Sequence, residues 1–169
     1  MDYQDLVNID EATYISSLSP DTNFGSSTVL NIYSWITFFL YTLINIGNGL
    51  EADFFKLKLY QTTTDAKDFK VYIADSSWVE GTVTYNNRPA PGDEIGSFTL
   101  LGEVGYQEYE ITGLTSQQIS DINSNGLILV KTLDENLQAT FTSDDGVNVP
   151  QYAYGAVTSD TSNFFQLFN

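Results

Sequence analysis

The sequence contains no cysteine and no histidine, and a single arginine stands among its 169 residues. The missing cysteines exclude disulfide bonds, thiolate nucleophiles and zinc sites built from thiolates. The missing histidines remove the usual general base and the commonest ligand of transition metals. A serine nucleophile would have no histidine partner, and paired carboxylates are the catalytic option that remains. We therefore expect that the protein is not an enzyme.

Positive charge is also scarce, because 22 acidic residues accompany only 6 basic ones and give a formal net charge of −16. Such a surface repels phosphate backbones, which argues against nucleic acid as a partner. It attracts cations instead. The acidity serves either solubility or the binding of calcium, which prefers carboxylate and amide oxygens.

Long hydrophobic runs are absent as well. The most apolar stretch, Trp35–Ile46, is interrupted by Thr37, Thr42 and Asn45, and about 20 apolar residues are needed to cross a bilayer. We expect no membrane insertion. The N-terminus, Met1–Asp5, is acidic and lacks the basic and apolar regions of a signal peptide, so none is expected in this chain. The length fits one domain over residues 1–169, with an N-terminal arm at 1–8 and an apolar C-terminal tail at 159–169.

Alternating apolar and polar residues recur along the chain and predict β-strands. The pattern is cleanest in Glu51–Gln61, where apolar side chains alternate with lysines and tyrosine. The expected strands are 10–16, 28–33, 37–46, 51–61, 69–74, 82–85, 95–101, 106–112, 127–132, 138–143 and 152–157. One short helix is expected after Thr115, which forms a capping box with Gln118. Many short strands and one helix predict an all-β fold, an antiparallel β-sandwich.

Three loops that combine Asp, Asn and Gly are either candidate calcium sites or ordinary polar turns. Residues 121–126 match the first half of an EF-hand loop, although Thr132 stands where the bidentate glutamate would be. The other two loops are 144–148 and 21–25, and we place Glu11 near the latter. The candidate ligands are Glu11, Asp21, Asn23, Asp121, Asn123, Asn125, Asp144 and Asp145.

The stretch from Ser76 to Pro91 concentrates the rare residues. It holds one of the two tryptophans, the arginine and two of the four prolines. Thr82–Tyr85 alternates and is β-branched, which predicts a brief strand, and residues 86–89 predict a turn. Loops this rich in large residues normally fold back onto the core as compact units.

The run Ser77–Pro89 resembles the signature of the DNRLRE-type domain family, a jelly-roll group that includes carbohydrate-binding modules. The family's usual form is Ser-Trp-x-Glu-Gly-Thr-Val-Thr-Trp-Asn-Asn-Arg-Pro, and Tyr85 replaces the second tryptophan. The resemblance extends over roughly residues 9–157. It implies a β-sandwich of jelly-roll type. It also implies that the loop is an internal clasp formed by Trp78, Glu80, Asn86, Asn87, Arg88 and Pro89.

Two functions remain open at this point. The first is a non-catalytic structural or attachment module on an extracellular assembly, most concretely a virion surface protein such as a capsid decoration or fibre component. The alternative is a carbohydrate-binding module for a polysaccharide, with calcium assisting. An acidic glycan would need calcium or a cluster of Lys56, Lys58, Lys67 and Lys70. Both functions place the protein outside the cell or on a virion.

The C-terminal tail carries four large apolar side chains within its last six residues. An exposed patch of this kind is adhesive, so the tail either packs on its own domain or contacts a protein partner in a larger assembly. The residues concerned are Phe164, Phe165, Leu167 and Phe168.

Overall fold

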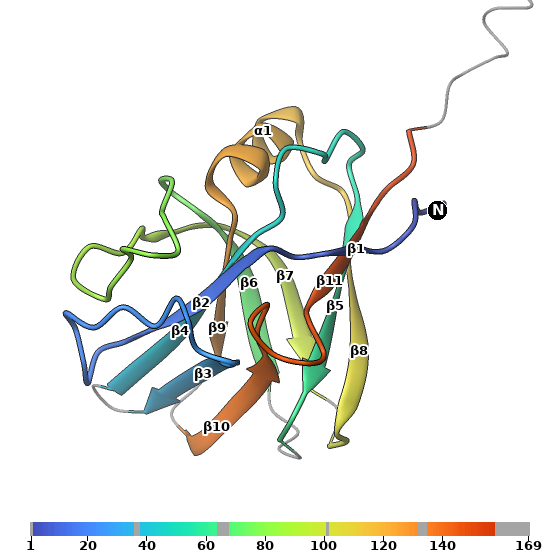
Figure 1. Cartoon of the computed structure of the whole chain (residues 1–169). Helices are drawn as coiled ribbons and strands as arrows, with labels where there is room; N and C mark the ends of the chain where they lie inside the picture. Colours follow the sequence, from blue (N-terminus) through green and yellow to red (C-terminus); the bar gives the residue numbers. More distant parts are fainter. Residues whose placement is uncertain (1, 36–37, 64–67, 101, 132–134, 158–169) are drawn as a thin grey trace, which may run out of the picture.

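Short strands account for most of the chain in the computed structural model, which describes residues 2–35, 38–63, 68–100, 102–131 and 135–157. These ranges hold eleven strands and one helix (Figure 1). The elements are β1 (Val7–Asn8), β2 (Glu11–Ser16), β3 (Val29–Trp35), β4 (Phe38–Asn45), β5 (Phe55–Gln61), β6 (Asp68–Ala74), β7 (Pro91–Thr99), β8 (Gly105–Ile111), α1 (Ser116–Asn125), β9 (Leu127–Lys131), β10 (Glu135–Thr142) and β11 (Gln151–Tyr154).

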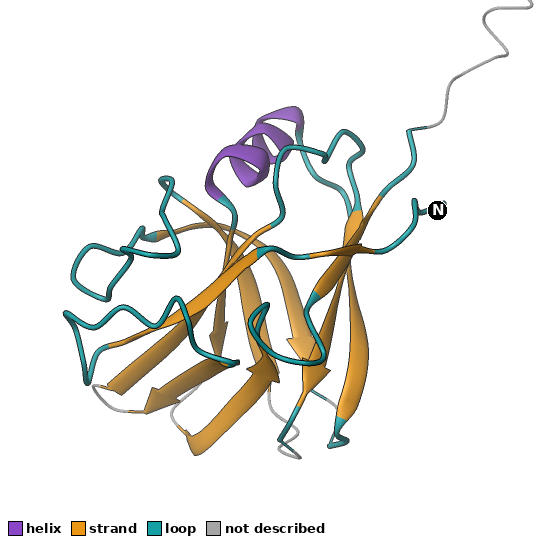
Figure 2. Cartoon of the chain, viewed as in Figure 1, coloured by secondary structure: helices purple, strands orange, loops and turns teal. Residues whose placement is uncertain are grey.

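The strands pair in one antiparallel sheet that curls on itself (Figure 2). Its order is β1-β11-β5-β10-β3-β4-β9-β6-β7, while β2 pairs with β4 and β8 pairs with β5. Strands distant in sequence are therefore neighbours, as when β11 and β8 lie on the two sides of β5. This curled open sheet with one short helix confirms the all-β, jelly-roll-like prediction.

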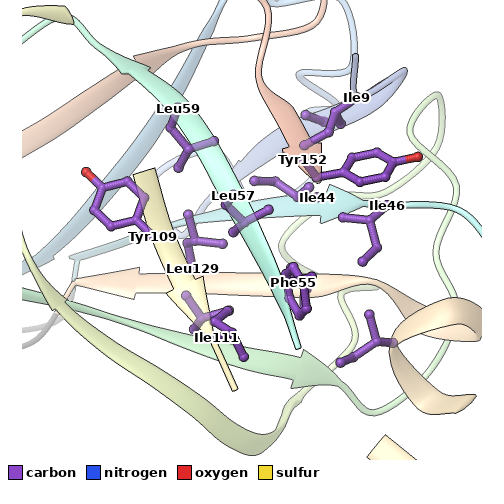
Figure 3. Packing of buried hydrophobic residues seen from close by; sticks show 14 of the residues in the cluster. Ile9, Ile44, Ile46, Phe55, Leu57, Leu59, Tyr109, Ile111, Leu129 and Tyr152 are labelled. Atoms are coloured by element: carbon purple, nitrogen blue, oxygen red, sulfur yellow. The ribbon is translucent and has the colours of Figure 1, made fainter. Parts of the chain in front are cut away.

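The inside of the curl is the main hydrophobic core. Phe55, Leu57 and Leu59 of β5 are fully buried, and the residues between them face outward. In the core they pack with buried side chains of the neighbouring strand β8 and of β4 and β9, including Ile111, Ile44 and Leu129 (Figure 3). Each such side chain contributes roughly 1.5–3 kcal/mol through removal of apolar surface from water.

A second cluster lies on the opposite face of β4 and β9. Leu43 and Ile128 are buried there with Val83 of the 76–91 loop, and Trp78 and Tyr85 pack against them. The loop therefore covers the sheet from outside. This explains why β4 and β9 are apolar on both faces, because one face meets the core and the other meets the loop.

The helix closes one end of the curl (Figure 2). The Thr115 hydroxyl accepts the Gln118 backbone N–H at 3.1 Å, and the Gln118 side chain accepts the Thr115 N–H at 3.0 Å, which confirms the predicted capping box. Gly126 ends the helix at φ 75°, a conformation that favours glycine. In the described ranges, α1 is neither long nor apolar enough to span a membrane.

The structure differs from the local sequence predictions in two places. Thr82–Tyr85 forms turns and not a strand, because Asn87 closes the segment on itself by accepting from Thr84 N and donating to Thr82 O. The N-terminal arm, in turn, contains a strand that the pattern did not predict. Its residues Val7 and Asn8 pair with β11.

Candidate functional site

The 76–91 loop is attached to the body of the protein through Trp78. Its indole nitrogen donates to the Asn125 carbonyl oxygen at 2.8 Å, at the end of α1. Pro89 is buried, whereas Asn86, Asn87 and Arg88 are exposed. The Arg88 guanidinium lies 3.7 Å from the centre of the Tyr85 ring and donates to the Tyr85 carbonyl oxygen at 2.7 Å. Among the described residues, Arg88 therefore contacts an aromatic ring and forms no ion pair.

The loop between β2 and β3 is bonded to the 76–91 loop. Asn23 donates to the carbonyl oxygens of Glu80 and Val83, at 2.7 and 2.8 Å. Asn86 donates to an Asp21 carboxylate oxygen at 2.5 Å. Figure 1 shows these two loops side by side at one edge of the sheet. In this arrangement the polar groups of Asp21 and Asn23 join loops.

The EF-hand-like stretch holds the helix in place. Asn123 accepts from Leu50 N at 3.1 Å and donates to Leu50 O at 2.8 Å, so its side-chain amide bonds to both backbone groups of Leu50. Asn125 donates to Ala74 O, and Asp121 accepts from Gln117 one turn earlier. Glu11, the remaining candidate ligand outside the loops, accepts from Asn45 on the neighbouring strand.

Carboxylates from two distant loops meet elsewhere. Glu80, Asp144 and Asp145 each place an oxygen within 4.8 Å of the other two, and we call this group the acidic junction. In the described part of the chain it is the one group of three acids close enough to share a metal ion. The family resemblance implies that Glu80 belongs to the clasp, and the sequence left the two aspartates as either candidate calcium ligands or part of a polar turn. No local pattern links residues 64 positions apart.

Several backbone contacts position the acidic junction. Glu80 accepts the Ala12 N–H of edge strand β2 at 2.9 Å. Ser143, which precedes the aspartates, donates its N–H to Thr28 O at 3.0 Å and its hydroxyl to Ser27 O. Gly25 lies against the Glu80 carbonyl oxygen, since a Cβ at that position would come within 2.4 Å of it. Three loops therefore converge on the carboxylates.

The acidic junction changes the acidity of Glu80 and Asp144. Burial, followed by repulsion from Asp144, raises the pKa of Glu80 to about 7. Burial, followed by repulsion from Asp145, raises the pKa of Asp144 to about 6. One oxygen of Asp144 is buried and has no hydrogen-bond partner among the described residues. Such a group gains stability from a bound proton or a bound cation, and three carboxylates are ligands that Ca²⁺ accepts.

The second feature is the outer surface of β5 and β8, with its neighbours β11 and the N-terminal segment. Strand register places Lys56 opposite Glu110, Lys58 opposite Glu108 and Tyr60 opposite Tyr106. These side chains alternate with the buried core residues and face outward. We call the surface formed by Lys56, Lys58, Tyr60, Tyr106, Glu108, Glu110 and Gln151 the β5–β8 face. Figure 1 shows its three strands side by side.

Side chains on the β5–β8 face are held by one another. The Lys56 ammonium lies 3.4 Å from Glu108 Oε2 and 4.5 Å from the centre of the Tyr3 ring. The Lys58 ammonium lies 5.0 Å from the centre of the Tyr106 ring. The rings of Tyr60 and Tyr106 meet edge to face with centres 5.1 Å apart.

The four lysines considered for an acidic glycan are not gathered in one place. Lys56 and Lys58 share the β5–β8 face, whereas Lys70 of β6 pairs with Glu94 of β7 at 3.2 Å. Lys67 lies outside the described residues, as do the tail residues Phe164, Phe165, Leu167 and Phe168.

The chain is a jelly-roll-like β-sandwich that presents aromatic and polar side chains to solvent, an architecture that lectin domains share. The comparison with protein families gives the particular group. The model of carbohydrate-binding module family 96 matches residues 4–154, and the chain belongs to this family. Membership indicates a non-catalytic binding module. No curated protein matched the chain. The resemblance to carbohydrate-binding modules is thereby confirmed, whereas the DNRLRE designation stays a prediction.

Proposed function

We propose that this chain is a non-catalytic module that binds a polysaccharide through the β5–β8 face. The observation that carries the proposal is the family match over residues 4–154. The face adds support, because tyrosine rings pack against the C–H groups of sugars while nearby polar groups bond to hydroxyls. Its side chains are already ordered by mutual contacts, which lowers the entropy lost on binding.

A panel of soluble and insoluble polysaccharides tests the proposal. Binding is measured by affinity electrophoresis and by pull-down, with calcium and with a chelator, since a calcium-assisted mode was predicted. We expect at least one polysaccharide to bind the wild-type chain, and Tyr60→Ala to weaken that binding by about tenfold, within the range of one aromatic contact.

The matched control is Lys70→Met, which changes an ion-paired lysine on β6, away from the β5–β8 face. It should bind as the wild type does. Tyr106→Phe keeps the ring and removes the hydroxyl that donates to Val149 O. It therefore distinguishes the contribution of the ring to binding from the contribution of its bond to the loop before β11. A folded wild-type chain that binds no polysaccharide under either condition would overturn the proposal.

We further propose that the module acts outside the cell, where polysaccharide surfaces are accessible. The sequence predicted that attachment to a virion or another assembly would use the ends of the chain. Residues 158–169 lie outside the described residues, and attachment, the first of the two functions considered from the sequence, stays a prediction.

A further inference from the structure

A row of half-exposed rings lies on the outer face of β4, beside the 76–91 loop. The rings of Phe39 and Tyr41 are stacked with centres 6.0 Å apart, and the centres of the Tyr41 and Tyr85 rings are 6.4 Å apart. Both tyrosines pack on the buried cluster that includes Leu43. The rings therefore rest on a fixed support and keep one side partly open to solvent.

Arg88 extends this row of rings. Its guanidinium lies 3.7 Å from the centre of the Tyr85 ring and donates to the Tyr85 carbonyl oxygen. Burial and then the neighbouring Tyr85 raise the pKa of Tyr41, an effect that the charge of Arg88 partly offsets. The guanidinium thus lies near both tyrosines. We call Phe39, Tyr41, Tyr85 and Arg88 the aromatic row.

Arg88 has no carboxylate partner, although the chain holds 22 acidic residues. Its side chain is exposed, and among the described residues its one hydrogen bond is the bond to Tyr85 O. A guanidinium carries five N–H donors in a planar fork, so most of them are available to a ligand. Stacking on Tyr85 and the bond to its carbonyl oxygen hold the fork in place, which lowers the entropy lost on binding.

From this geometry we propose that the aromatic row is a second site at which the module binds polysaccharide. The inference rests on the proposed function for its class of ligand, and it goes beyond that function by giving one module two sites. Tyrosine rings pack against the C–H groups of sugars. The guanidinium donors complement the oxygen atoms of a sugar, whether these belong to hydroxyl or carboxylate groups.

The two sites lie on different sides of the molecule. Figure 1 shows β2 and β4 on one side of the curled sheet and β5 and β8 on the other. A polymer segment that lies along one face has to pass around the protein to reach the other. Two sites in this arrangement engage separate segments, so the module joins polysaccharide chains.

The test uses a soluble polysaccharide that binds in the panel and a short oligosaccharide cut from it. Isothermal titration of the intact chain with the oligosaccharide should give two bound equivalents. Light scattering should rise when the chain is mixed with the polymer, because each protein molecule joins two segments. The double variant Tyr85→Leu/Arg88→Met should bind one equivalent and lose the rise in scattering. Leucine keeps apolar packing on the buried cluster.

Single variants assign the two sites. Arg88→Met alone should weaken binding at the aromatic row by about tenfold. Lys70→Met is the matched control, because it removes the same unit of charge from a lysine that already pairs with Glu94, and it should keep two equivalents. Tyr60→Ala, on the β5–β8 face, should leave binding at the aromatic row unchanged and should also reduce the scattering.

The outcomes separate this inference from the proposed function. If no polysaccharide binds to the folded chain, the proposed function fails. If one equivalent binds and the double variant keeps it, the proposed function stands and the aromatic row is overturned as a site. Two equivalents that the double variant also keeps would overturn it as well. One equivalent that the double variant loses, and that Tyr60→Ala keeps, overturns the inference of two sites. Thermal melting of each variant confirms that it is folded.

Discussion

Glu80 and Asp144 are two residues whose acidity the local sequence does not predict. Glu80 bonds to the backbone of β2 while lying against an aspartate of another loop. The clasp motif explains its presence in the 76–91 loop. It does not explain why the Asp144 carboxylate lies beside Glu80. The two carboxylates repel each other at the place where three loops are held together.

Burial of the two carboxyl groups, followed by repulsion from neighbouring carboxylates, predicts how stability changes with pH. In the folded chain the pKa of Glu80 is raised from 4.5 to about 7 and that of Asp144 from 3.8 to about 6. The folded state therefore holds these protons more tightly than the unfolded state does. The penalty of charging the pair is absent below about pH 4 and complete above about pH 7, so this contribution to stability falls as pH rises.

Glu80→Gln should therefore raise the melting temperature at pH 8 and flatten its dependence between pH 4 and pH 7. The amide oxygen can still accept the Ala12 N–H, and the amide nitrogen can donate to Asp144. Glu103→Gln, at an exposed position, is the control and should leave the pH dependence unchanged. If the melting temperatures of wild type and Glu80→Gln change with pH in the same way across this range, the expectation is contradicted.

Trp78 is a single side chain that attaches the 76–91 loop to the helix α1. Trp78→Ala removes the packing on Leu43 and Ile128 and the bond to Asn125 O. We expect a loss of about 3 kcal/mol in the free energy of unfolding, measured by urea denaturation. Trp78→Phe keeps most of the packing and should cost only about 1 kcal/mol, the value of the lost hydrogen bond. Equal losses for the two variants would show that packing is not the main term.

At the level of elements, the strands followed the sequence closely. Alternation predicted both β5 and β6, because one face of each is buried and the other is half exposed, although β5 begins at Phe55 and not at Glu51. β4 lacks this alternation, since the 76–91 loop buries its outer face. The predicted strand at Thr82–Tyr85 is absent, because its β-branched residues lie in a turn in which Val83 alone is buried.

The contact between the two loops can be tested with a pair of glycines. A Cβ on Gly25 would lie 2.4 Å from the Glu80 carbonyl oxygen, whereas a Cβ on Gly81 would meet nothing within 4 Å. Gly25→Ala should lower the free energy of unfolding by about 1–3 kcal/mol, because the loops must separate. Gly81→Ala should change it by less than about 0.5 kcal/mol. Chemical denaturation measures both values. Equal effects of the two substitutions would mean that the loops can separate at Gly25 without a loss in the free energy of unfolding.

For the whole molecule, the dominant property is the excess of negative charge. Folding brings these charges closer together than they are in the unfolded chain. Raising NaCl from about 20 mM to about 300 mM shortens the screening length from roughly 20 Å to roughly 6 Å. We expect the melting temperature at pH 8 to rise by several degrees.

The control uses the same salt series near pH 4, close to the isoelectric point of about 4.1. The net charge is then near zero, and the rise should disappear. A rise of the same size at both pH values would indicate a general salt effect and not relief of repulsion.

The sequence alone predicted the class of fold, the helix, and the packing of the 76–91 loop onto the core. Alternation and capping depend on residues a few positions apart, which a sequence displays directly. The acidic junction and the β5–β8 face could not be read in this way. Glu80 meets Asp144 because separate loops converge, and Lys58 lies beside Gln151 and Glu108 because β5 pairs with β11 and β8. Such neighbours are set by the order of strands in the sheet, and that order arises from burying all the apolar faces together.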